Sequence, residues 1–198
     1  MSQTTATHAL APLVARLVDA AELEPEALEL RDPSLGPKEY IEAMAKAGQH
    51  IDAIKFLAHL LPRREAVWWA WMCARREAGP NPEPEIAVAL EATETWIGEP
   101  TDQNRRAAMQ AAEAASFETA AGCAALAAFL SGGSLAPPEL PEVAPPRFVA
   151  ARAVFGSLVL SAVSVQPERA PERFRRFLAY GLELADRIKL WESLERKA

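Results

Sequence analysis

Cysteine and histidine are scarce in this chain, which has two cysteines and three histidines among 198 residues. A disulfide-stabilised scaffold needs more cysteine than this, and a structural zinc site needs closely spaced Cys and His ligands that the chain does not offer. Cys73 and Cys123 lie in apolar surroundings that favour helices. We expect both to be buried, reduced and unreactive thiols, with a disulfide between them as the minor alternative.

Catalytic and cofactor-binding motifs are also lacking. The chain has no GxSxG or HExxH sequence and no recognisable pairing of a nucleophile with a base. Gly132-Gly133 precedes a proline-rich segment rather than a helix. It therefore cannot hold a phosphate as the glycine-rich loop of a nucleotide-binding protein does. We predict no catalytic residue, no cofactor and no metal, and a protein that is not an enzyme.

An excess of positive charge and a long apolar run are missing as well. The net charge of −6 argues against nucleic acid as a partner, because nucleic-acid-binding domains carry a net basic footprint. The most apolar stretch, residues 148–165, is interrupted by Arg152 and Gly156, so we expect a buried helix there and no membrane span. The N-terminus lacks the basic leader and apolar core of a secretory signal. We therefore expect a cytoplasmic protein.

Runs of β-branched residues are rare, whereas alanine is abundant. This composition predicts an all-α protein of seven to nine helices, arranged as one bundle or as an orthogonal array. We expect a single domain, in which residues 1–36 form an acidic N-terminal helix and loop and residues 37–198 form the main helical part. Residues 131–146 contain five prolines and two glycines, which predicts a non-helical strap between helices.

Three of the five tryptophans fall within four residues of one predicted helix, which runs from Pro62 to about Glu77. Trp68 and Trp71 share one helical face with Arg75, and Trp69 lies on the neighbouring face. We predict that Trp68 or Trp71 is the side chain that anchors the core.

The arginines of this helix allow two interpretations. They pair with carboxylates of a neighbouring helix or stack on the tryptophans, or they form part of a partner-binding rim. The first interpretation is the main expectation, and the second rests on the enrichment of tryptophan and arginine at interface hot spots. The candidate partner-binding residues are Arg63, Arg64, Trp68, Trp71 and Arg75.

Residues 171–197 are predicted to form a long terminal helix with an apolar seam. The seam contains Phe174, Phe177, Leu184 and Trp191, and basic residues flank it. Residues 78–146 carry ten acidic and two basic side chains. We therefore expect the terminal helix to pack on the alanine-rich residues 105–130, with homo-oligomerisation through residues 171–197 as the alternative.

Two segments, LPRREAVWW at residues 61–69 and FLSGGSLAPPELPEVAPP at residues 129–146, resemble a family of uncharacterised bacterial proteins of about this size. The resemblance extends over residues 40–185. Relatives occur near the genes of type VI secretion systems in Gram-negative bacteria. The resemblance therefore implies an accessory role beside a secretion apparatus, and it assigns no active-site residue.

These observations favour a non-enzymatic adaptor, chaperone or scaffold that binds another protein. The alternative is a small-ligand-binding protein or enzyme whose pocket lies between helices near the tryptophans. A pocket in which carboxylates converge on tryptophan and arginine would favour the enzyme. An apolar groove without such carboxylates would favour the adaptor.

Overall fold

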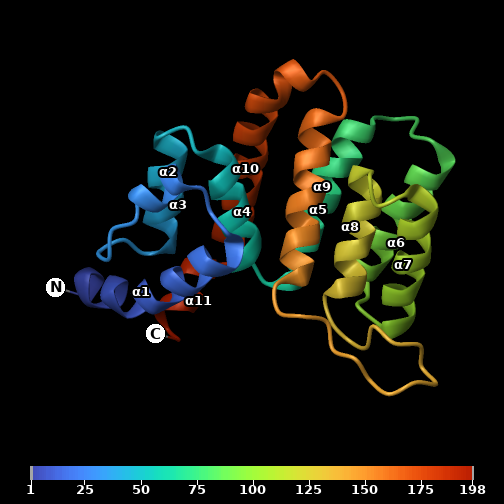
Figure 1. The fold of residues 1–198 in the computed structure, drawn as a ribbon, viewed down its shortest axis with the longest axis horizontal. Coiled ribbons are helices and arrows are strands. Elements are labelled where there is room, and N and C mark those ends of the chain that lie inside the picture. The colour runs from blue at the N-terminus through green and yellow to red at the C-terminus, as the bar shows by residue number, and fades with distance from the viewer. Residues whose placement is uncertain (1, 198) are drawn as a thin grey trace. The chain divides into compact units, whose positions relative to one another are not determined.

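The structure is a computed structural model that describes the backbone of residues 2–197 and the side chains of residues 10–197. Within that range the chain forms eleven α-helices and no strand, and nine of the helices have seven or more residues. The all-α prediction is confirmed. The helices (Figure 1) are α1 Ser2–Ala21, α2 Pro25–Glu29, α3 Pro37–Lys46, α4 His50–Leu60, α5 Arg63–Ala78, α6 Pro84–Gly98, α7 Asp102–Ala115, α8 Ala120–Leu130, α9 Val149–Val163, α10 Ala170–Arg187 and α11 Leu190–Glu195.

The helix limits follow from proline and from side-chain caps. Pro37 occupies the first turn of α3, where a missing N–H costs nothing. The Thr101 hydroxyl accepts a hydrogen bond from the first turn of α7, and that of Thr119 does so for α8. Between these two helices Ser116 adopts a positive φ of 65°, which ends α7. The sequence of residues 105–130 predicts an alanine-rich helical stretch with a break near Ser116, and the structure confirms that break.

The proline-rich segment 131–146 is non-helical, as predicted. Its base is closed by a backbone hydrogen bond of 2.8 Å from Leu135 N to Val143 O. The Ser134 hydroxyl accepts bonds from the amides of Ala136 and Val143. The strap is therefore a closed loop that presents Leu140, 56% exposed, at its far end.

The chain divides into two compact units. Unit 1 combines Met1–Leu61 with Phe174–Ala198, and unit 2 is Pro62–Arg173. The sequence predicted one domain with an acidic segment ending at residue 36, which is not where these units meet. Whether the two units unfold together as a single domain stays a prediction.

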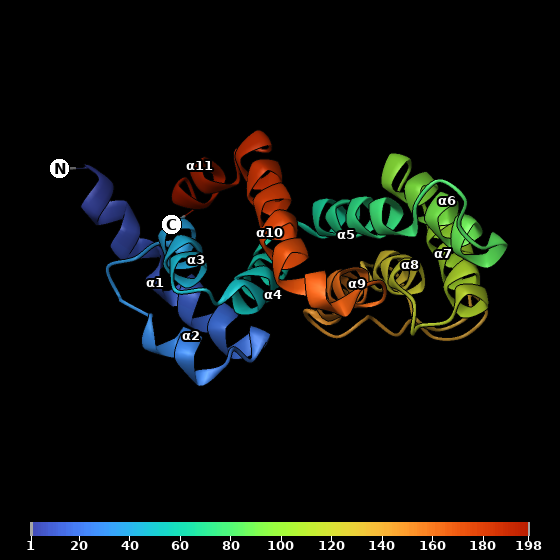
Figure 2. The same cartoon turned by 90° about the horizontal axis from the view of Figure 1, so that it is seen from above.

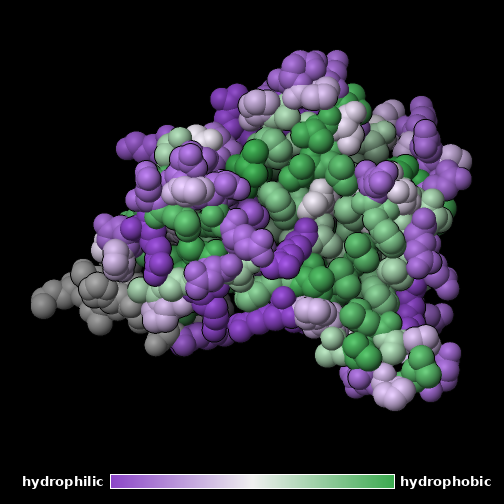
Figure 3. Space-filling model, viewed as in Figure 1, coloured by the Kyte–Doolittle hydropathy of each residue, from purple (hydrophilic) through white to green (hydrophobic). Residues whose placement is uncertain are grey.

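Unit 2 is a bundle of α5 to α9, which lie side by side in both views (Figures 1 and 2). The central element is α8, which contacts α5, α6, α7 and α9. Six of its eleven residues are alanine, and small side chains let helix axes approach closely. The face formed by α8, α9 and the strap is largely apolar (Figure 3).

In unit 1, α4 packs against α1 and α3, and α11 packs against α1. The predicted seam of the terminal helix is buried at Phe174, Phe177 and Leu184. Residues from Phe174 onward belong to the same compact unit as residues 1–61. The predicted packing on residues 105–130 stays a prediction. Oligomerisation through residues 171–197 stays a prediction.

The terminal helix is also not continuous. It ends at Arg187, and Lys189 takes a positive φ of 54° before α11 begins. The Trp191 indole donates to the Asp186 carboxylate at 2.6 Å, and Lys38 Nζ lies 3.1 Å from the same carboxylate. These contacts hold the corner, and they keep the pKa of Asp186 below its usual value, chiefly through the Trp191 bond.

The tryptophan prediction named the wrong side chain. Trp69 is fully buried, whereas Trp68 and Trp71 are half-buried. Both cysteines are buried, and neither takes part in a disulfide. Burial raises the pKa of the Cys123 thiol, which favours the unreactive form.

In the part of the chain that the structure describes, no single helix is long and apolar enough to cross a membrane. One sharply bent pair, Val149–Val163 followed by Pro167–Arg187, meets the criteria of length and composition together.

Candidate functional site

The predicted partner-binding residues lie along one stripe of α5. Arg64, Trp68, Trp71 and Arg75 recur at spacings of four, three and four, which keeps them on one helical face. This face meets α6, because Arg64 and Trp71 both donate hydrogen bonds to main-chain carbonyls of that helix. The stripe is therefore partly an internal contact between two helices.

The arginines at the start of α5 do not pair with carboxylates, contrary to the first sequence interpretation. Arg64 Nε donates to the Ile97 carbonyl at 2.6 Å, at the end of α6. Arg63 Nη1 donates to the Ser131 carbonyl at 2.8 Å, at the end of α8. A helix C-terminus leaves carbonyls without intrahelical partners and carries a partial negative charge. The ends of the neighbouring helices thus offset the unfavourable position of both cations in the first turn of α5.

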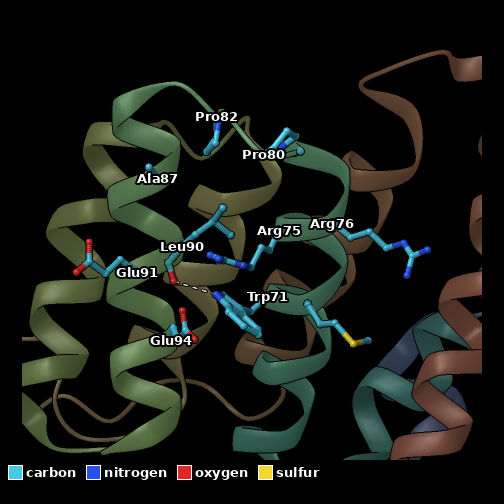
Figure 4. A pocket seen from close by; sticks show the side chains of 11 residues that line it. Trp71, Arg75, Arg76, Pro80, Pro82, Ala87, Leu90, Glu91 and Glu94 are labelled. Carbon is cyan, nitrogen blue, oxygen red and sulfur yellow. Dashed lines mark hydrogen bonds between the residues drawn. The ribbon is translucent and has the colours of Figure 1, made fainter.

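The second half of α5 borders a groove of about 770 Å³ between α5 and α6 (Figure 4). The Trp71 indole reaches across to α6, where its Nε1 donates to the Leu90 carbonyl at 2.9 Å. Arg75 stacks on the Trp71 ring, with the guanidinium carbon 5.7 Å from the ring centroid. This contact confirms the predicted cation–π pairing for Arg75. Figure 4 shows Arg75 pointing toward α6 and Arg76 pointing away from it.

The groove combines an apolar lining with charges of opposite sign. Pro80 and Pro82 close the end where the chain turns from α5 into α6. On the α6 side, Glu91 and Glu94 are exposed. Figure 4 shows the Glu91 carboxylate on the side of α6 away from Trp71. The Glu91 carboxylate therefore does not converge on the tryptophan and arginine.

A second, smaller hollow of about 350 Å³ lies at the opposite end of α5. Arg63 and Arg64 line it together with Arg105, Asp102 and the glycine pair at residues 132 and 133. Arg105 is 3% exposed, and its Nη2 lies 2.6 Å from the Asp102 carboxylate. Hydrogen bonds from Arg106 and Arg105 hold the pKa of Asp102 below its usual value.

The structure thus separates four of the five predicted residues into two sites. Trp71 and Arg75 line the groove, and Arg63 and Arg64 line the hollow. Trp68, although half-buried on the same stripe, is among the lining residues of neither.

Sequence reasoning missed the residues that complete each site, Leu90 in the groove and Arg105 in the hollow. Leu90 was predicted only as core. Arg105 gave no local signal, because nothing in the sequence reveals that its partners are Asp102 and the main chain of a later segment.

Among the described residues, no group of three or more His, Cys, Asp or Glu side chains is placed to hold a metal ion. The chemistry on offer in both sites is therefore that of guanidinium, indole and carboxylate groups.

The fold is all-α, and both candidate sites lie between helices. The family model for a family of unknown function, DUF6931, matches residues 40–185, and the chain belongs to this family. The match covers all of unit 2 and the adjoining parts of unit 1. No curated protein and no solved structure gives a significant match.

Proposed function

We propose that this protein is a non-enzymatic adaptor that holds a segment of a partner protein in the groove between α5 and α6. The observation that carries the proposal is the lining of that groove. Trp71 and Ala87 offer apolar surface, and Arg75 adds a cation on the α5 wall. Partly exposed tryptophan and arginine side by side are typical of interface hot spots.

The charges of the groove indicate the chemistry of the segment. Arg75 on α5 and Glu94 on α6 line opposite walls. Among the described residues neither takes part in a salt bridge. A segment with an apolar side chain between an acidic and a basic residue fits this pattern, and the opposed charges fix its direction.

The alternative, a small-ligand-binding protein or an enzyme, is supported by one observation. A volume of about 770 Å³ lies in the range of small-molecule pockets. The position of Glu91 argues against catalysis, because its side chain points away from Trp71 and Arg75 (Figure 4). General acid–base work needs groups that reach the same reacting atom.

The resemblance to proteins found near type VI secretion genes supplies a context for the partner. On that basis alone, we propose that the partner belongs to a bacterial secretion apparatus.

A pair of adjacent residues on α6 provides the test. Ala87 lines the groove, whereas Val88, 53% exposed, does not. A photo-crosslinking amino acid is placed at either position in the native host, and crosslinked proteins are identified by mass spectrometry. We expect a specific protein adduct from position 87 and none from position 88.

Peptides covering the crosslinked region are then titrated against purified protein by calorimetry. We expect Arg75→Glu to weaken binding about tenfold, and a peptide with its acidic residue changed to lysine to recover much of that loss. Equal crosslinking from both positions, or a small molecule bound in place of a protein, contradicts the adaptor.

A further inference from the structure

The hollow at the start of α5 has an excess of positive charge for its size. Three arginines, Arg63, Arg64 and Arg105, line a volume of about 350 Å³ that contains a single carboxylate, Asp102. The C-termini of α6 and α8 each contribute about half a negative charge there, and the N-termini of α5 and α7 each contribute about half a positive charge. The balance is an excess of about 2 positive charges.

Arg105 does not supply binding groups of its own. Its three guanidinium nitrogens donate to Asp102 and to the carbonyls of Phe129 and Ser134. With a side chain only 4% exposed, it contributes a fixed positive field behind the hollow. A Cβ on Gly133 would come within 2.8 Å of the Arg105 Nε, so the glycine pair leaves room for this arrangement.

Arg63 and Arg64 differ from Arg105, because both are exposed and only partly satisfied. Arg63 uses one nitrogen, Nη1, for the Ser131 carbonyl. Arg64 uses Nε and Nη2 for the carbonyls of Ile97 and Gly98. Arg63 Nε and Nη2 and Arg64 Nη1 remain as donors. The carbonyl bonds hold both guanidinium groups in place before a ligand arrives, which lowers the entropic cost of binding.

We infer that this hollow binds a phosphate group. Arginine forks match the geometry of phosphate oxygens, and a phosphate monoester carries about 1.5 to 2 negative charges at neutral pH. That charge is close to the excess in the hollow, whereas a carboxylate supplies only one. The volume lies at the lower end of small-molecule sites and admits the phosphate with a few further atoms. This site lies apart from the groove between α5 and α6, and the inference does not rest on the adaptor proposal.

The test uses inorganic phosphate, O-phosphoserine, acetate and chloride at matched ionic strength, with binding followed by thermal shift and calorimetry. We expect stabilisation by phosphate and O-phosphoserine and much weaker effects of acetate and chloride. Tighter binding of O-phosphoserine than of inorganic phosphate would identify a ligand that carries its phosphate on a larger molecule. The reverse order would identify free phosphate.

Two kinds of variant locate the site. Arg64→Gln should weaken phosphate binding about tenfold, since a hydrogen bond to a charged group is lost, whereas Arg147→Gln, an equal charge change outside the hollow, should not. Because Arg64 also caps α6, a second variant leaves that contact intact. A Cβ on Gly132 meets no atom within 4 Å. Gly132→Glu should therefore fold and compete with phosphate through its own carboxylate, and Gly132→Ala should bind normally.

Equal stabilisation by chloride and phosphate overturns the inference. So does equal weakening by Arg64→Gln and Arg147→Gln, or unchanged phosphate binding in Gly132→Glu. Acetate that binds as tightly as phosphate also overturns it, because the hollow would then recognise carboxylates.

Discussion

The two compact units use different means to fill their interiors. In unit 1 large side chains meet, and the rings of Tyr40 and Phe56 pack edge to face at 5.3 Å between centroids. In unit 2 the central helix α8 contributes mostly alanine, and one large side chain, Trp69, is fully buried on α5. A core of large side chains tolerates some rearrangement, whereas closely spaced helices leave no free volume.

The units also differ in how they satisfy buried polar groups. Unit 2 buries Arg105 and Arg173, which donate to carbonyls where α8 and α9 end. Unit 1 buries Asp52, whose carboxylate accepts from the Glu24 amide at 3.0 Å, just before α2. Closely packed helices exclude water from their C-terminal carbonyls, and arginine is long enough to reach them. In unit 2, buried arginines therefore take the place of water at the carbonyls that close helix packing hides.

The largest expected effect concerns Trp69, the largest fully buried side chain of unit 2. Trp69→Ala should lower the free energy of unfolding by about 3–5 kcal/mol, because a fully buried indole leaves a cavity. Trp71→Ala, at a half-buried position, should cost less than half as much. Urea denaturation of both variants measures the difference, and equal losses would mean that no single tryptophan anchors the unit.

The next effect concerns Arg173, a buried residue in the first turn of α10 that donates to a carbonyl at the end of α9. Arg173 Nε lies 2.8 Å from Glu77, and the two side chains are only 7% and 15% exposed. Arg173→Met should cost about 2–4 kcal/mol, because Glu77 would lose this ion pair and stay largely buried. The double variant with Glu77→Leu should recover part of that loss. If it recovers nothing, the carbonyl bonds of Arg173 rather than the ion pair carry its contribution.

Alanine substitutions at two glycines test the close packing of unit 2, because they should change the free energy of unfolding in opposite directions. A Cβ on Gly122 would lie 2.0 Å from the Ser116 carbonyl oxygen, so Gly122→Ala should destabilise by about 1–3 kcal/mol. A Cβ on Gly156 would lie 3.7 Å from the Cys123 sulfur, an ordinary contact. Gly156→Ala, inside α9, should therefore stabilise by about 0.4–1 kcal/mol. Thermal unfolding measures the change in stability of each variant. If Gly156→Ala also destabilises the protein, α8 and α9 lie closer together than in the structure described above.

The smallest effect concerns Asp102, whose pKa is lowered mainly by the hydrogen bond from Arg106. A carboxyl with a depressed pKa in the folded state stabilises the protein above its unfolded pKa. This contribution is lost as pH falls through the folded value. Stability of the wild type should thus fall below about pH 4 more steeply than that of Asp102→Asn. The effect is small because the side chain is 57% exposed. If the acid-unfolding curves of the wild type and Asp102→Asn run parallel, the ionised Asp102 carboxylate does not stabilise the protein through Arg105.

Much of the helix pattern could be predicted because proline, glycine and capping residues mark the ends of helices. The break after α7 was predicted near Ser116, but the break at Lys189 was missed because neither glycine nor proline stands there. Helical periodicity placed Trp69 beside the face of Trp68 and Trp71. It could not decide which face is buried, since apolar residues surround the whole helix.

The candidate site was predictable only in part, for a physical reason. Sequence displays the charges of side chains but not the carbonyls at the ends of folded helices. Arg63 and Arg64 were therefore assigned carboxylate partners, whereas their partners are the carbonyls of Ser131 and Ile97. The groove depends on the approach of α6 to α5, which no local pattern in either segment encodes.

The division of the chain imposes an order on its synthesis. Unit 2 is one continuous stretch, Pro62–Arg173, so it can close as soon as that stretch has left the ribosome. Unit 1 is built from the two ends of the chain. The apolar surface of residues 1–61 that Phe174 and the residues after it cover therefore stays exposed until those residues have been made. The newborn chain is most prone to aggregate during that interval, when its middle is folded and its beginning is not.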